Sequence, residues 1–118
     1  MKDNISNLEK LVKEFCEERD WDQFHNPKDL SIGISTEANE LLELFRFKSR
    51  KDIEHIMNNV NEKEKVENEL ADIMFFILRF TQMNNIDLEH ILIRKIKINN
   101  EKYPKDLSKG SNKKYNEL

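Results

Sequence analysis

The chain has 118 residues, the size of one domain with a core of its own. Because it contains only two glycines and two prolines while 36% of its residues are charged, a turn-rich β-sandwich and a glycine-rich phosphate loop are both disfavoured. The single cysteine, Cys16, cannot form an internal disulfide, and a net charge of -3 gives no general attraction to nucleic acid. No stretch is apolar enough for a signal peptide or a membrane span. We therefore expect a cytoplasmic protein whose partners include neither a membrane nor a nucleic-acid polymer.

Apolar residues recur at helical spacing along most of the chain, which predicts an all-α fold. The first predicted helix begins at Ser6, which opens an SNLE capping box, and ends near Glu18. The segment RDWDQFHNPKD then breaks the helical period and predicts a loop. Further helices are expected from about Asp29 to Phe45, from Lys51 to Asn58 with Ser49 as its cap, from Asn61 to Asn84, and from the cap Asp87 to Asn100. These helices form one predicted domain, residues 1–104, and the polar and basic segment 105–118 is expected to be a mobile arm.

Two of the predicted helices carry carboxylates at the edge of their apolar faces. With about 100° per residue, Glu37 and Glu40 fall along one edge of the apolar stripe of the second helix. Glu69 falls among the core positions of the long helix, and Asp72 lies on the flank of the same face. An ionised carboxylate buried without a partner is strongly unfavourable or becomes protonated, so two inward pairs indicate a bound cation. Oxygen ligands on two rigid helices suit Mg²⁺, with Mn²⁺ as a substitute.

Structural interpretations of the same residues remain open at this point. The four acids would also be satisfied by a structural ion-pair network with one or more of the arginines Arg46, Arg79 and Arg94. Two Asp-x-x-His pairs, at residues 52–55 and 87–90, have the spacing of metal ligands, but both lie where helices are expected to start. We interpret these aspartates as helix caps.

E-x-x-E followed after a spacer by E-x-x-D resembles the signature of the MazG-like superfamily of all-α nucleoside triphosphate pyrophosphohydrolases. The segments ERDWDQFHNPKDL, ELLELFRFK, ENELADI, KINNEKYP and KKYNEL resemble its dCTP pyrophosphatase branch, so the likeness extends from Leu8 to Leu118. The resemblance implies a four-helix bundle-like protomer that assembles as a homodimer or homotetramer. It also implies cleavage of a nucleoside triphosphate between the α and β phosphates, with dCTP or a modified dCTP as substrate. The Mg²⁺ ligands that it implies are Glu37, Glu40, Glu69 and Asp72.

The resemblance also implies roles for residues outside the acid pairs. Trp21 matches a tryptophan that lines the base pocket of the family, and its flat ring would stack on a pyrimidine. His25 also matches this branch and is implied as a substrate-binding residue, although from its residue type alone we interpret it as structural. Phe47, also implied as substrate-binding, stands where close relatives have a second tryptophan. The phosphate-contacting residues implied are Lys95, Asn99 and Tyr103. Lys95 would neutralise the leaving pyrophosphate and joins the four acids as a predicted catalytic residue.

Two other classes of protein share some of these features. A non-catalytic helical oligomerisation or interaction module would explain the amphipathic helices, but it leaves the inward acids without a role. A di-iron carboxylate bundle needs Glu-x-x-His on two helices, and neither acid-bearing helix supplies a histidine three residues after its inner glutamate. Together with the inward acids, the resemblance therefore favours a Mg²⁺-dependent nucleotide pyrophosphohydrolase.

Overall fold

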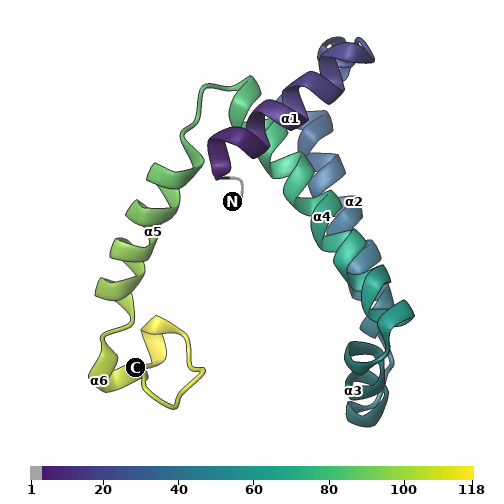
Figure 1. Ribbon diagram of the computed structural model, residues 1–118. Helices are drawn as coiled ribbons and strands as arrows, with labels where there is room; N and C mark the ends of the chain where they lie inside the picture. The colour runs from purple at the N-terminus through teal and green to yellow at the C-terminus, as the bar shows by residue number, and fades with distance from the viewer. Residues whose placement is uncertain (1–3) are drawn as a thin grey trace. The chain divides into compact units, whose positions relative to one another are not determined.

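The computed structural model describes residues 4–118, and all the regular structure in that range is helical (Figure 1). This confirms the predicted all-α fold. The chain divides into two compact units, Met1–Asn85 and Ile86–Leu118, which are described separately below. Among the described residues, none of the helices is both long enough and apolar enough to cross a membrane.

The first unit is built around one long helix. Its elements are α1 (Ile5–Glu18), the 3-10 turn η1 (Asp22–Phe24), α2 (Pro27–Phe45), α3 (Arg50–Asn58) and α4 (Val60–Met83). Helix α2 lies along α4, and α1 and α3 pack against α4 as well (Figure 1). The buried apolar side chains come from all four helices and are Cys16, Leu30, Ile56, Val66 and Leu78. Helix α4 is therefore the common support for everything else in this unit.

Side-chain caps set where the helices begin. The Asn4 side chain accepts a hydrogen bond from the backbone N–H of Asn7 at 2.9 Å, so α1 begins before Ser6, and the prediction of Ser6 as its cap was wrong. Asn26 caps α2 in the same way, by accepting a hydrogen bond from the backbone N–H of Asp29 at 2.9 Å. Pro27 takes the first helical position, where a missing N–H costs no hydrogen bond. The predicted cap at Ser49 is confirmed as a reciprocal capping box with the side chain of Asp52.

Helices α2 and α4 approach each other closely one turn from the predicted acid sites. A Cβ atom added at Gly33 would lie 2.8 Å from ring carbons of Phe76, which is closer than such contacts allow. Gly33 precedes Glu37 by one helical turn, and Phe76 follows Asp72 by one turn, so these pairs share helix faces. The small residue on α2 therefore permits the short distance between helices at which opposing carboxylates meet.

The second unit consists of α5 (Leu88–Lys102), α6 (Lys105–Ser108) and the 3-10 turn η2 (Tyr115–Glu117). Asp87 caps α5 by accepting a hydrogen bond from the backbone N–H of His90 at 3.0 Å, which confirms its interpretation as a cap. The sequence predicted a mobile arm in residues 105–118, and the structure has two short helical turns there. The rings of Tyr103 and Tyr115 meet edge to face at 6.1 Å, and the Lys102 ammonium lies 4.8 Å from the Tyr115 ring centroid. These contacts return the polar segment to the end of α5.

Candidate active site

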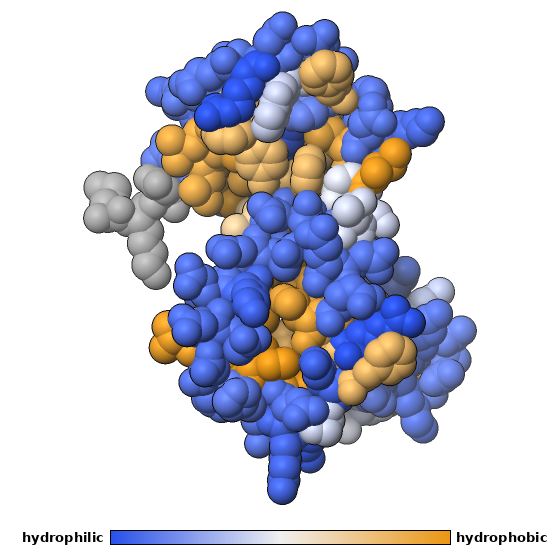
Figure 2. Space-filling model, turned by 90° about the vertical axis from the view of Figure 1, so that its right-hand side faces the viewer, coloured by the Kyte–Doolittle hydropathy of each residue, from blue (hydrophilic) through white to orange (hydrophobic). Residues whose placement is uncertain are grey.

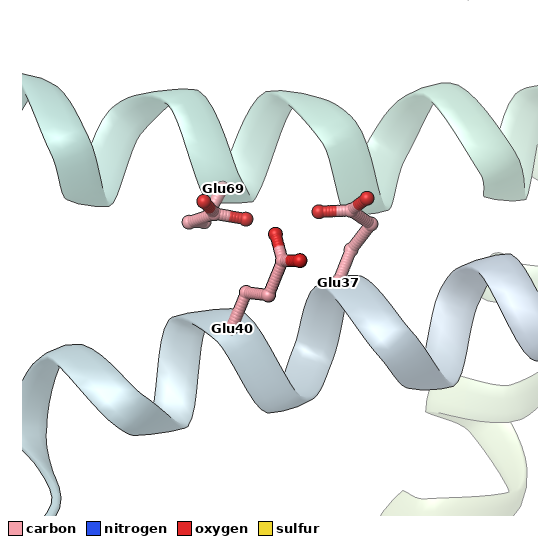
Figure 3. Close-up of side chains that lie close together, drawn as sticks. All are labelled: Glu37, Glu40 and Glu69. Atoms are coloured by element: carbon pink, nitrogen blue, oxygen red, sulfur yellow. The ribbon is translucent and has the colours of Figure 1, made fainter.

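Three of the four predicted metal ligands form a tight cluster. Glu37 and Glu40 project from α2 toward α4, and Glu69 projects from α4 toward them (Figure 3). One carboxylate oxygen from each lies within 4.8 Å of the other two. Asp72 lies outside this tight group, but it lines a pocket together with Glu37, and its charge acts on that residue. The structure thus brings three of the four predicted acids together and places the fourth, Asp72, beside them in the lining of the same pocket.

Among residues 4–118, no basic side chain pairs with the acids of this cluster. One oxygen of Glu37 and one of Glu69, Oε2 in both, are buried without a hydrogen-bond partner. Within residues 4–118, no ion pair involves Glu37, Glu40, Glu69 or Asp72. The three arginines that could have paired with them do not do so: Arg46 bonds to Glu43 at 3.1 Å, Arg79 pairs with Asp22, and Arg94 forms no ion pair in the described range.

Burial and like charge act together on these carboxyls. The pKa of Glu37 is raised to about 7, mainly by burial and further by the carboxyls of Glu40 and Glu69 and the charge of Asp72. Burial is also the main reason that the pKa of Glu69 is raised. Both the orphaned oxygens and the raised pKa values describe a site short of positive charge. An all-oxygen donor set of this kind fits a hard divalent cation such as Mg²⁺ or Mn²⁺.

An apolar pocket adjoins the acid cluster. It has a volume of about 480 Å³ and is lined by Leu11, Val12, Phe15, Trp21, Glu37, Asp72, Phe75 and Phe76. The Trp21 ring meets the Phe15 ring edge to face at 5.6 Å, and Phe15 meets Phe75 at 5.7 Å, so three aromatic rings form one wall. Glu37 and Asp72 belong both to this pocket and to the acid group. A ligand with a flat apolar part and an anionic part would therefore find complementary surfaces side by side, provided a cation bridges the acids.

The chain matches the MazG-like family over residues 32–118. It is 33% identical to dCTP pyrophosphatase 1 of Rattus norvegicus and 32% identical to dCTP pyrophosphatase 1 of Homo sapiens, each over 114 residues covering 97% of this chain and 67% of the relative. The crystal structure of a pyrophosphatase from Archaeoglobus fulgidus matches with a TM-score of 0.79 and 30% identity, covering 88% of this chain and 95% of that one. The chain belongs to the MazG-like family. The predicted family and enzyme class are thus confirmed, and the protein is a MazG-like pyrophosphohydrolase.

The structure of this MazG-like protein separates the remaining predicted site residues. Trp21 lines the pocket, but Phe47, a residue that is 91% exposed just beyond the end of α2, does not. Phe47 also adopts a positive φ of 62°, which is uncommon for a large side chain. Lys95 and Asn99 lie on α5 and Tyr103 ends it, so all three belong to the second unit.

His25 contacts Trp21 but does not line the pocket. Its Nδ1 accepts a hydrogen bond from Nε of Arg79 at 2.7 Å, and the two aromatic rings of Trp21 and His25 are 6.1 Å apart. Burial lowers the pKa of His25, and the Arg79 charge lowers it further. The geometry agrees with the structural interpretation of His25 drawn from the sequence.

Sequence reasoning did not identify the role of Arg79 within this MazG-like fold. The side chain is 1% exposed, and its partners lie in the loop before α2 and in its own helix. A signal was present, because Arg79 interrupts the apolar run FFILRF of the long helix. Such an arginine requires a partner when it is buried, and in this structure the loop RDWDQFH supplies the acid, Asp22.

Proposed function

We propose that the protein is a Mg²⁺-dependent nucleoside triphosphate pyrophosphohydrolase that cleaves between the α and β phosphates, giving a monophosphate and pyrophosphate. The observation that carries the proposal is the pair of buried, unpartnered carboxylate oxygens of Glu37 and Glu69 within a cluster of three glutamates. Buried polar atoms are nearly always satisfied in native proteins, and a divalent cation would satisfy these. Mn²⁺ would substitute, since it accepts the same oxygen donors.

The proposed roles of the chain's own residues follow from their positions. Glu37, Glu40, Glu69 and Asp72 hold the metal, which when bound neutralises phosphate charge and orients the triphosphate for in-line attack. A carboxylate of the same group that is not engaged by metal orients the attacking water or accepts its proton. Lys95 is proposed to neutralise the leaving pyrophosphate, while Asn99 and Tyr103 are proposed to contact the phosphates.

The pocket beside the acids supports a nucleobase as the flat part of the substrate. Stacking of a base on an aromatic ring contributes about 1–3 kcal/mol, and Trp21 offers such a ring in the pocket wall. The relatives named dCTP pyrophosphatase 1 point to a cytosine nucleotide, so we propose dCTP or a 5-substituted dCTP as substrate. Phe47 is proposed as a second stacking group because its ring is exposed.

Exposed apolar side chains support assembly into a homodimer or homotetramer. Leu42 on α2 is 54% exposed and Leu70 on α4 is 52% exposed, although both belong to helices that form the core. Figure 2 shows apolar patches framed by polar side chains on one face of the molecule. Exposed apolar patches of this kind often mark the contact surfaces of oligomers. We propose that other copies of the chain cover these side chains, and that the protein works in the cytoplasm.

A nucleotide panel assayed with Mg²⁺, resolving phosphate from pyrophosphate, tests the proposal. We expect a monophosphate and pyrophosphate as products, dCTP or a 5-substituted analogue among the best substrates, and loss of turnover in EDTA. Orthophosphate as the first product would overturn the reaction, and equal turnover in EDTA would overturn the metal. No turnover of any nucleotide would instead favour the non-catalytic helical module.

A further inference from the structure

Arg79 uses all three guanidinium nitrogens inside the first unit. Nε donates to Nδ1 of His25 at 2.7 Å, Nη1 donates to the Gln82 side chain at 2.8 Å, and Nη2 donates to the Asp22 carboxylate. The Gln82 amide in turn donates to the backbone carbonyl of Glu9 on α1 at 2.7 Å. One buried side chain on α4 therefore joins α1, α4 and the loop that leads into α2.

That loop carries Trp21. The Trp21 backbone N–H donates to the Cys16 carbonyl at 3.0 Å, which ties the residue to the end of α1, and one side of its ring packs against Phe15. Asp22 follows Trp21 directly in the chain, and the His25 ring meets the Trp21 ring edge to face. Two of the three groups bonded by Arg79 thus flank Trp21, one through the backbone and the other through an aromatic contact.

The same helix carries the acids. Arg79 follows Asp72 by seven positions, which is close to two helical turns, so both project from nearly the same face of α4. Phe75 and Phe76, which line the pocket, lie between them. A rigid helix therefore fixes the distance from the acid cluster at one end of the pocket to the anchor of the Trp21 loop at the other.

We propose that Arg79 is a positioning residue for the substrate pocket, holding Trp21 in register with the acid cluster through Asp22 and His25. The inference rests on the proposed function in that Trp21 is taken to bind the base, while Arg79 itself touches no substrate. Because Nδ1 of His25 accepts the hydrogen bond from Arg79, the neutral ring carries its proton on Nε2. Asp22, whose side chain is 52% exposed, balances the buried charge.

Trp21 is the only tryptophan of the chain, so its fluorescence reports on the loop without any substrate. Arg79→Met keeps a long side chain and removes all the donors. In this variant we expect acrylamide quenching of Trp21 to rise about twofold, and KM to rise about tenfold with kcat changed by less than about threefold, since ground-state binding is what a mobile ring loses. Arg79→Lys keeps the positive charge but loses the planar set of N–H donors. Its quenching and its KM should therefore lie between those of Arg79→Met and wild type.

Two controls separate positioning from general loss of stability. Ile56→Ala opens a cavity in the buried contact of α3 with α4, away from the Trp21 loop, and should leave quenching and KM as in wild type. On the loop itself, His25→Leu removes the acceptor of Arg79, whereas His25→Asn keeps an oxygen near the place of Nδ1. We expect His25→Leu to reproduce the Arg79→Met effects and His25→Asn to rescue most of them.

Unchanged quenching and KM in folded Arg79→Met would overturn the proposal, and so would equal changes in Ile56→Ala. If Arg79→Met does not fold, the His25 pair decides: identical behaviour of the leucine and asparagine variants would overturn it. Failure of the proposed function gives a different result, because wild type would then turn over no nucleotide while the quenching measurements still report whether Arg79 holds Trp21.

Discussion

Helix α4 contributes to two polar clusters that differ in the sign of the charges they bring together and in whether their buried polar atoms have partners. Around Glu69, three carboxylates of like charge meet, and two of their oxygens have no partner. Around Arg79, unlike charges meet, and each guanidinium nitrogen donates a hydrogen bond. Since folding alone satisfies nearly every buried polar group, the unsatisfied cluster indicates a place completed by a ligand, and the satisfied cluster indicates a support. The contrast also predicts opposite changes in metal-free stability when one charge is removed from each cluster.

The largest expected effect is on catalysis at the unsatisfied cluster. Glu69→Gln removes one charge while nearly keeping the shape, so we expect kcat to fall about 10²-fold or more because a metal clamp on the phosphates is lost. Metal-free stability should be unchanged or higher, since repulsion among the acids is relieved. Urea midpoints of wild type and variant, each in EDTA and in excess Mg²⁺, measure this together with kcat. A large loss of metal-free stability would contradict a metal-site role for Glu69.

The satisfied cluster should respond with the opposite sign. Asp22→Ala leaves the Arg79 charge buried without its carboxylate, and broken buried pairs are destabilising by about 3–5 kcal/mol. Because the Asp22 side chain is 52% exposed, solvent screening reduces our expectation to about 2 kcal/mol, equal with and without Mg²⁺. Glu43→Ala is the matched control: it breaks the exposed pair with Arg46 and should change stability by about 0–1 kcal/mol. Equal losses of stability in the two variants would mean that the buried Asp22–Arg79 pair contributes no more than an exposed ion pair.

Trp21 lines the pocket beside the acids and contacts His25 of the Arg79 cluster. Its replacement tests binding of the nucleotide base. In Trp21→Ala we expect KM for the nucleotide to rise about tenfold and kcat to fall less, because stacking contributes mainly to ground-state binding. Steady-state kinetics on the best nucleotide of the panel measure both constants. An unchanged KM would return Trp21 to a purely structural role.

The two clusters also differ in how far the sequence could predict them. Helical spacing is a local property, so periodicity alone places Glu37, Glu40 and Glu69 on the inward edges of their helices. The Asp22–Arg79 pair joins residues 57 positions apart, and its formation depends on the path of the loop before α2, which no local pattern encodes. The side-chain caps show the same limit on a smaller scale: the preference for serine before a helix predicts the Ser49 cap correctly, whereas the SNLE capping-box pattern favours Ser6 over the true cap Asn4.

The arm after Pro104 departs from its prediction for a similar reason. Its composition is polar and basic, which predicts little burial, but Tyr115 reaches back to Tyr103 and Lys102. Composition averages over a segment, whereas a single well-placed aromatic ring is enough to return it to a helix end. The roles of Lys95 and Asn99 stay predictions, because they depend on a unit described separately from the acid cluster.

The smallest expected effect concerns the pH dependence of metal-free stability. The pKa of Glu37 is about 7 in the folded protein, above its ordinary value near 4.5. A raised carboxyl pKa means that the folded state binds a proton the unfolded state has released, so this stability is present below the ordinary value and is lost as pH rises through about 7. The pKa of Glu69 shifts in the same direction, and the coupled acids titrate as a group.

His25 changes stability with pH in the opposite direction. The pH dependence of wild-type stability alone would therefore not isolate the contribution of Glu37. Its pKa is lowered mainly by burial, so its contribution is present above its ordinary value and is lost as pH falls. Comparing wild type with Glu37→Gln cancels the His25 contribution, because both proteins keep the Arg79 cluster. In EDTA we expect the urea midpoint of Glu37→Gln to rise relative to that of wild type as pH increases from about 5 to about 8. The total change should not exceed what the titration of one carboxyl can contribute. Excess Mg²⁺ should reverse the preference at about pH 8, because the metal stabilises deprotonated acids and Glu37→Gln lacks one of them. A difference between the two proteins that does not change with pH would mean that Glu37 is ionised throughout, and the cluster would then need no cation to relieve it.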